Sequence, residues 1–187
     1  MRIAVLGWGS LIWDPRELHV ASGWQEGGPV LPIEFSRISD NDRLTLVIDE
    51  AHGVDVPTRH ALSSLSDLDA AVTDLQKREG APNRDRIGFL EVTRNRLSKR
   101  ARAMHPVACE RICAWAEAKN LDGVVWTAIG PRFREKTGEP FSVEAAIRYL
   151  DRVDKVTFAR TLHYVWNAPP EVQTPVRTAV EKRWPEG

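Results

Sequence analysis

The chain has 187 residues, 42% of them hydrophobic, and its 26 acidic and 26 basic residues give a formal net charge of zero. This length suits one domain that buries its own core without disulfides, and we expect a single domain over residues 1–187. Balanced charge gives no overall field for nucleic acid or an anionic membrane, and no segment approaches the ~20 apolar residues of a membrane span.

The first element is an apolar segment, Ile3–Leu6, that runs into a glycine-rich turn, Gly7–Leu11. The segment is typical of a buried strand, and glycines in the turn permit backbone conformations that a Cβ would forbid. Successive N–H groups could then point into one concavity that binds a carboxylate, a phosphate or an oxyanion. The dinucleotide fingerprint is incomplete, because Ile12 stands where the third glycine is required. The glycines and Ser10 interrupt the apolar run, which argues against a signal peptide.

A β-hairpin and a further strand are expected next. Residues 30–38 and 43–48 read as two strands joined by the polar turn at residues 39–42, and residues 54–59 are extended.

A helix follows, with Ser66 as its expected N-cap and apolar residues Leu68, Val72 and Leu75 at helical spacing. Gly80 ends it, directly after Glu79.

The second half of the chain predicts a strand at residues 86–93, a helix at 106–119 and a buried strand at 124–128. Residues 94–105 are basic but hold no aromatic residue to stack a base, so we expect a solvated loop and no nucleic-acid partner. Three helical patterns follow, at residues 142–153, 158–166 and 174–183. Strands first and helices last indicate an α+β fold with a helix-rich C-terminal part.

The two cysteines, Cys109 and Cys113, lie four residues apart on the predicted helix that begins at Pro106. His105 precedes this proline and is biased out of the helical conformation, and no fourth ligand is evident. We therefore expect two small buried side chains and no metal site.

Two segments resemble the γ-glutamyl cyclotransferase superfamily. Trp8-Gly9-Ser10-Leu11 resembles the family's Tyr-Gly-Ser-Leu turn with Trp in place of Tyr, and Asp74–Gly80 resembles the helix end that carries the family's catalytic glutamate. The resemblance covers roughly residues 1–130. It implies an α+β fold in which a small mixed β-barrel or sheet is surrounded by helices.

The resemblance also implies a cytoplasmic enzyme that cyclises a small γ-glutamyl amide to 5-oxoproline and releases a free amine or amino acid, without cofactor or metal. It makes Glu79 the catalytic acid and base. Glu50, at a predicted strand end, is the competing candidate. The expected substrate-binding residues are Gly7, Trp8, Gly9, Ser10, Leu11 and Arg37, with Arg37 suited to a bidentate contact with a substrate carboxylate.

Ser10 is assigned to hydrogen bonding, because the sequence lacks the glycine that a nucleophile elbow requires. Trp8 lacks the phenolic hydroxyl of the family's Tyr, so a hydrogen bond made by that hydroxyl is lost or passes to the indole N–H. The sequence does not name the leaving amine, and glutathione, γ-glutamyl amino acids and γ-glutamyl polyamines stay open. Trp8, Trp13 and Trp126 are candidates for an aromatic pocket wall. Two alternatives stay open: a non-catalytic module that binds a small carboxylate or amine on the same fold, and an acyl-transfer reaction that uses the same carboxylate.

Overall fold

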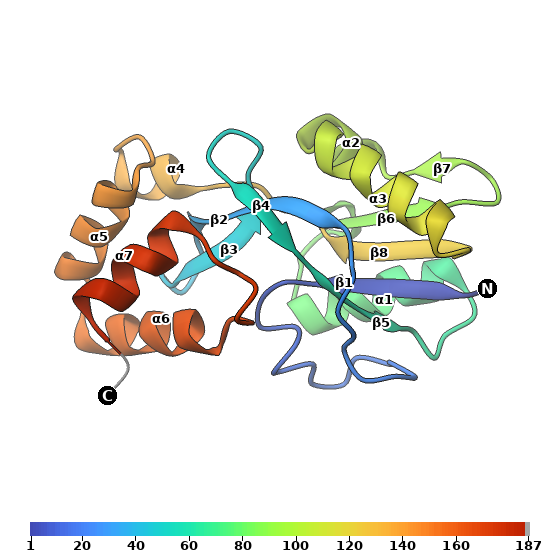
Figure 1. The fold of residues 1–187 in the computed structure, drawn as a ribbon, viewed down its shortest axis with the longest axis horizontal. Coiled ribbons are helices and arrows are strands. Elements are labelled where there is room, and N and C mark those ends of the chain that lie inside the picture. The colour runs from blue at the N-terminus through green and yellow to red at the C-terminus, as the bar shows by residue number, and fades with distance from the viewer. Residues whose placement is uncertain (186–187) are drawn as a thin grey trace.

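Two sheets and seven α-helices make up the computed structural model, which describes residues 1–185 (Figure 1). The larger sheet has five strands in the order β5-β1-β8-β6-β7, and β1 runs parallel to β8 while the other neighbours are antiparallel. Its strands are β1 (Ile3–Gly7), β5 (Arg59–Leu62), β6 (Ile87–Glu91), β7 (Arg96–Leu97) and β8 (Gly123–Thr127).

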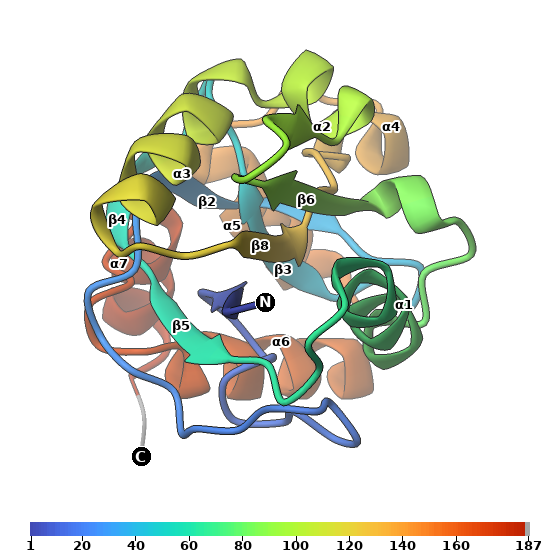
Figure 2. The ribbon, with the colours of Figure 1, turned by 90° about the vertical axis from the view of Figure 1, so that its right-hand side faces the viewer.

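Helices cover both faces of this larger sheet, as Figure 2 shows in a view from the N-terminal side. Side chains alternate between the two faces along β1, so Ile3 and Val5 face one core cluster while Ala4 and Leu6 face the other. The first cluster includes the buried face of α1 (Leu68–Glu79), and the second includes α3 (Pro106–Ala118), beside which lies α2 (Lys99–Met104).

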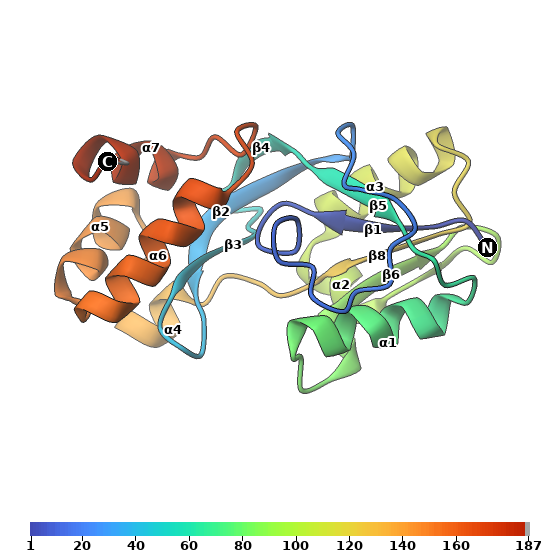
Figure 3. The same ribbon diagram turned by 90° about the horizontal axis from the view of Figure 1, so that it is seen from below.

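The smaller sheet has the order β3-β2-β4 and lies against the C-terminal helices (Figure 3). A bulge between Glu34 and Arg37 interrupts the regular pairing of β2 with β3. The strands and helices of this part are β2 (Val30–Ile38), β3 (Leu44–Ile48), β4 (Val54–Pro57), α4 (Phe133–Thr137), α5 (Val143–Arg152), α6 (Lys155–Asn167) and α7 (Pro175–Arg183).

The structure confirms the α+β class, the hairpin and the helix-rich C-terminal part. The barrel alternative was wrong, because the strands of the described chain form two open sheets rather than one closed on itself. Residues 94–105 are not a loop throughout, since they contain β7 and α2. None of the helices within residues 1–185 has the length and apolar character needed to cross a bilayer.

Candidate functional site

A cavity of about 230 Å³ lies where the two sheets approach each other. The parallel strands β1 and β8 both end at it with their carboxyl ends, where α/β sheets commonly place ligands. Because β6 is antiparallel to β8, the start of β6 meets the same edge, with Ile87 opposite Thr127. Residues from both sheets, α1 and α6 line it: Leu6, Gly7, Trp8, Gly9, Ser10, Leu11, Arg37, Ser39, Asp40, Arg43, Thr45, Leu46, Val47, Glu79, Gly80, Ala81, Pro82, Arg86, Thr127, Ile129 and Tyr164.

The segment Gly7–Leu11 leaves β1 and enters a helix-like turn. Ile12 N–H donates to the Gly9 carbonyl at 2.9 Å, and Asp14 N–H donates to the Ser10 carbonyl at 2.8 Å. The N–H groups of Gly9 and Leu11 have no hydrogen-bond acceptor within residues 1–185, as at the start of any helical turn. The turn therefore presents free backbone donors at the edge of the cavity.

The expected reason for the two glycines was wrong, because neither Gly7 nor Gly9 has a positive φ. Both are needed for close approach instead: a Cβ on Gly7 would lie 2.8 Å from the Trp24 ring. A Cβ on Gly9 would lie 2.3 Å from the Tyr164 hydroxyl oxygen.

Tyr164 brings a phenolic hydroxyl from α6 to this turn. Its hydroxyl faces the Ser10 backbone amide, and its pKa is raised chiefly by burial. The Arg43 guanidinium lies over the Tyr164 ring at 4.4 Å from the centroid, and Trp13 packs edge-on against that ring at 5.2 Å. A phenol thus lines the cavity together with Trp8.

Glu79 lies in the last turn of α1, which ends at Gly80 in the left-handed conformation with a φ of 59°. The neighbouring Arg78 is buried, with 8% of its surface exposed. It donates to Glu79 Oε1 at 2.6 Å and to the Asp14 carbonyl at 2.6 Å, and lies 3.4 Å from Ser10 Oγ. Arg78 therefore ties the catalytic candidate to the N-terminal turn, while Glu79 Oε2 has no partner in the described part of the chain.

Arg37 follows the bulge of β2 and is 9% exposed. Its Nη1 donates to the Gly130 carbonyl at 2.9 Å. Burial, followed by the positive charges of Arg132 and Arg86, lowers its pKa. Burial is also the main cause that lowers the pKa of Arg43.

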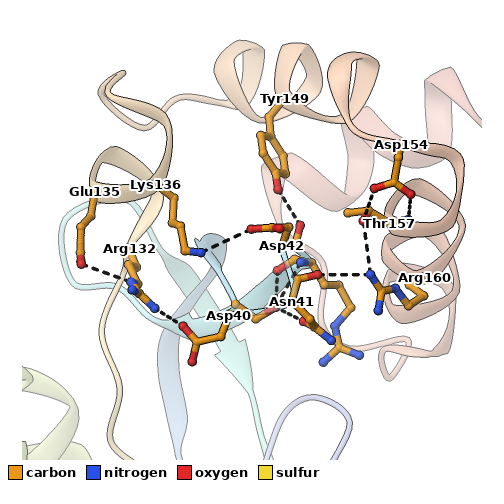
Figure 4. A network of polar contacts seen from close by, with 12 residues as sticks. Asp40, Asn41, Asp42, Arg132, Glu135, Lys136, Tyr149, Asp154, Thr157 and Arg160 are labelled. Carbon is orange, nitrogen blue, oxygen red and sulfur yellow. Dashed lines mark hydrogen bonds and ion pairs between the residues drawn. The ribbon is translucent and has the colours of Figure 1, made fainter.

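The β2–β3 hairpin that carries Arg37 and Arg43 is held at its tip by the C-terminal helices (Figure 4). Arg132 pairs with Asp40, Lys136 Nζ lies 3.3 Å from Asp42 Oδ1, and the Tyr149 hydroxyl donates to the Asp42 carbonyl at 2.6 Å. These contacts fix the hairpin relative to the cavity.

The structure brings all the sequence-predicted site residues to one cavity: Gly7, Trp8, Gly9, Ser10, Leu11, Arg37 and Glu79. The competing candidate does not line it, because the Glu50 carboxylate accepts from Ala108 N–H at 2.8 Å and caps α3. Of the three tryptophans considered, Trp8 lines the cavity, whereas Trp126 is fully buried beside Gly88.

Sequence reasoning missed four site residues: Arg43, Arg78, Arg86 and Tyr164. The burial of Arg78 could have been inferred from the sequence, because it follows the apolar Leu75 by three residues and so shares its helix face. The other three meet the site through tertiary contacts that leave no local pattern.

The cysteines lie on α3, away from the cavity. Cys109 is buried, which raises its pKa to about 12, and Cys113 is half-buried. No cluster of three or more His, Cys, Asp or Glu residues suited to a metal occurs within residues 1–185.

Comparisons with protein-family models, with curated proteins and with solved structures gave no match to this chain.

Proposed function

We propose that this chain cyclises a γ-glutamyl amide to 5-oxoproline and a free amine, as a γ-glutamyl cyclotransferase does. One observation carries the proposal: the Gly7–Leu11 turn and Glu79, which are distant in sequence, line the same cavity. The Arg78 guanidinium joins them, with bonds to Glu79 and to the Asp14 carbonyl beyond the turn.

The reaction joins the substrate's own α-amino nitrogen to its γ-carbonyl carbon and breaks the bond from that carbon to the leaving nitrogen. The proton lost by the attacking nitrogen is the proton that the leaving nitrogen gains, so one carboxylate can carry it. Glu79 does this through Oε2. The step needs no oxidant, reductant or second substrate.

The free N–H groups of Gly9 and Leu11 and the Tyr164 hydroxyl are the donors for the substrate carboxylate and for the developing oxyanion. Tyr164 supplies the phenol that position 8 lacks. Fixed donors of this kind stabilise a transition state because they need no reorganisation when charge develops.

The non-catalytic binding module remains the second candidate, and the Arg78–Glu79 pair at 2.6 Å favours it. In that function Glu79 orients Arg78, and the turn and arginines hold a small carboxylate ligand without turnover.

The test is release of 5-oxoproline, followed by mass spectrometry, from a panel of γ-glutamyl peptides and γ-glutamyl amines. We expect Glu79→Gln to lower kcat by at least about 100-fold, the usual contribution of a general acid and base. Glu50→Gln is the matched control, because this carboxylate caps α3 outside the cavity, and it should retain turnover.

Turnover that survives in Glu79→Gln and falls in Glu50→Gln would overturn the assignment of Glu79. A folded wild-type chain that turns over none of the panel, yet binds its members in calorimetry, would establish the binding module instead.

A further inference from the structure

The charged side chains that line the cavity are unequally paired. Its two carboxylates, Asp40 and Glu79, each hold an arginine that does not line it, namely Arg132 and Arg78. The three arginines that do line it form no ion pair with any residue of the described chain: Arg37, Arg43 and Arg86. The lining therefore carries positive charge that the protein does not neutralise.

Two of these arginines, Arg37 and Arg86, lie near each other. After burial, the charges that affect the pKa of Arg37 are those of Arg132, Arg86, Asp40 and Glu135. For the pKa of Arg43, the charges that follow burial include those of Arg78 and Glu79. Arg43 is thus close to the proposed acid and base, and Arg37 is close to Arg86.

Arg37 and Arg86 come together because of the sheet edge. Arg86 directly precedes β6 at the edge where β8 ends, and its carbonyl accepts from Ala128 N–H at 2.8 Å. The Arg37 guanidinium reaches the same edge and donates to the Gly130 carbonyl.

A cation that is nine-tenths buried without a carboxylate partner is costly, and two neighbouring cations add repulsion to that cost. One neutral carbonyl, that of Gly130, leaves most of the five N–H donors of Arg37 available. An anionic group placed between the two guanidinium groups would satisfy these donors and remove the repulsion.

We propose that Arg37 and Arg86 bind a carboxylate on the leaving part of the substrate, so that the chain prefers γ-glutamyl amino acids to neutral or cationic γ-glutamyl amines. This inference rests on the proposed cyclotransferase function. The turn and Glu79 hold the glutamyl part, and the two arginines hold the acid group of the amine that departs. A polyamine leaving group would place its positive charges against both arginines and is disfavoured.

The test compares two substrates that differ at one group, γ-glutamylglycine and γ-glutamylglycinamide. The second replaces the leaving carboxylate by a neutral amide of nearly the same size. We expect kcat/KM of the wild-type chain to favour γ-glutamylglycine by about tenfold or more, the usual effect of one charged hydrogen-bonded contact. In Arg86→Gln this ratio should fall close to one, and in Arg86→Lys it should be intermediate.

Arg84→Gln is the matched control, because Arg84 lies two residues away on the same short 3₁₀ helix, Arg84–Arg86, but pairs with Asp69 outside the cavity. It should keep the wild-type ratio. A wild-type ratio near one, or a ratio that Arg86→Gln leaves unchanged, would overturn the subsite.

Measurements of substrate binding can test the carboxylate subsite independently of the proposed reaction. In Glu79→Gln, calorimetry should show tighter binding of γ-glutamylglycine than of the glycinamide, and adding Arg86→Gln should abolish the difference. If wild type turns over neither compound but this difference is found, the reaction fails and the carboxylate subsite stands. If both compounds are turned over equally well, the reaction stands and the subsite fails.

Discussion

The two walls of the cavity differ in how their charges are satisfied. On the wall formed by the N-terminal turn and α1, Arg78 already serves both Glu79 and a backbone carbonyl. On a second wall, formed by β2 and the start of β6, Arg37 and Arg86 have no carboxylate partner within residues 1–185. A wall that pairs its own charges has its geometry fixed before a ligand arrives, whereas a wall with unpaired charge leaves the neutralising group to the ligand.

The largest loss of stability is expected when Arg78 is removed from the wall that pairs its own charges, the one formed by the N-terminal turn and α1. Arg78→Ala leaves the Asp14 carbonyl without its donor and Glu79 without its cation, so the free energy of unfolding should fall by about 3 kcal/mol. Urea denaturation measures it. Lys77→Ala, at the exposed neighbouring position, should stay within about 0.5 kcal/mol of wild type. A loss below about 1 kcal/mol in Arg78→Ala would mean that this wall is not held by its pairing.

A smaller effect is expected where the turn meets α6. Gly9→Ala would drive a methyl group against the Tyr164 hydroxyl, and such overpacking should cost about 2 kcal/mol in urea denaturation. Tyr164→Phe in the same chain removes the clashing oxygen and leaves the ring carbon at 3.3 Å, so the double variant should recover part of the loss.

Gly23→Ala is the control for this substitution, because a Cβ at Gly23 meets no atom within 4 Å. Equal stability of Gly9→Ala and Gly23→Ala would contradict the close approach of Tyr164 to the turn.

The sequence predicts the wall formed by the N-terminal turn and α1 better than it predicts the rest of the cavity. The turn and α1 are encoded locally: Ile3–Leu6 is continuously apolar, and Leu68, Val72 and Leu75 repeat at helical spacing. Even there the N-cap is Asp67 rather than the expected Ser66, since the Asp67 side chain accepts from Ala70 N–H. Element ends depend on single hydrogen bonds and are therefore the least determined by pattern.

The rest of the charged and phenolic cavity lining could not be predicted beyond Arg37 and Glu79, because strand order and helix packing bring these residues to the cavity. Arg86 reaches the cavity only because β6 lies antiparallel beside β8, and Tyr164 reaches it only because α6 packs near β3. Neither arrangement has a local sequence signal. In the same way, the sequence correctly indicated that position 9 needs a glycine. The reason is the close approach of the Tyr164 hydroxyl and not a positive φ at Gly9.

A third, pH-dependent effect concerns Glu34, a buried carboxyl on the strand that also carries Arg37. Its pKa is raised above 4.5 mainly by burial, while hydrogen bonds from Thr174 and from the Phe35 and Val176 N–H groups oppose that change. Because the pKa of Glu34 is higher in the folded state than in the unfolded state, its contribution to stability is fully present at pH values below the unfolded-state pKa. This contribution is lost as the pH rises through the folded-state pKa. A tenfold difference in proton affinity between the folded and unfolded states corresponds to about 1.4 kcal/mol.

The difference in unfolding free energy between wild type and Glu34→Gln should therefore move against wild type as the pH rises from about 4.5 to about 7. Urea denaturation across that range measures it, with Glu17→Gln, a substitution at an exposed position, as the matched control. A difference that moves in favour of wild type would show that the hydrogen bonds to the carboxylate outweigh its burial.

The smallest effect is expected at the hairpin tip, which connects the unpaired wall to the C-terminal helices. Tyr149→Phe removes the hydroxyl that donates to the Asp42 carbonyl, a loss of about 1 kcal/mol in urea denaturation. Arg160→Met removes a longer contact, 3.3 Å from Nη2 to the Asn41 carbonyl, at an exposed position and should cost less. Because Asp40 and Lys136 also hold the tip through their own ion pairs, neither change should release Arg37. The KM for γ-glutamylglycine should then rise by less than about threefold. A larger rise in KM with unchanged stability would show that the C-terminal helices set the position of Arg37 in the cavity, rather than only stabilising the hairpin.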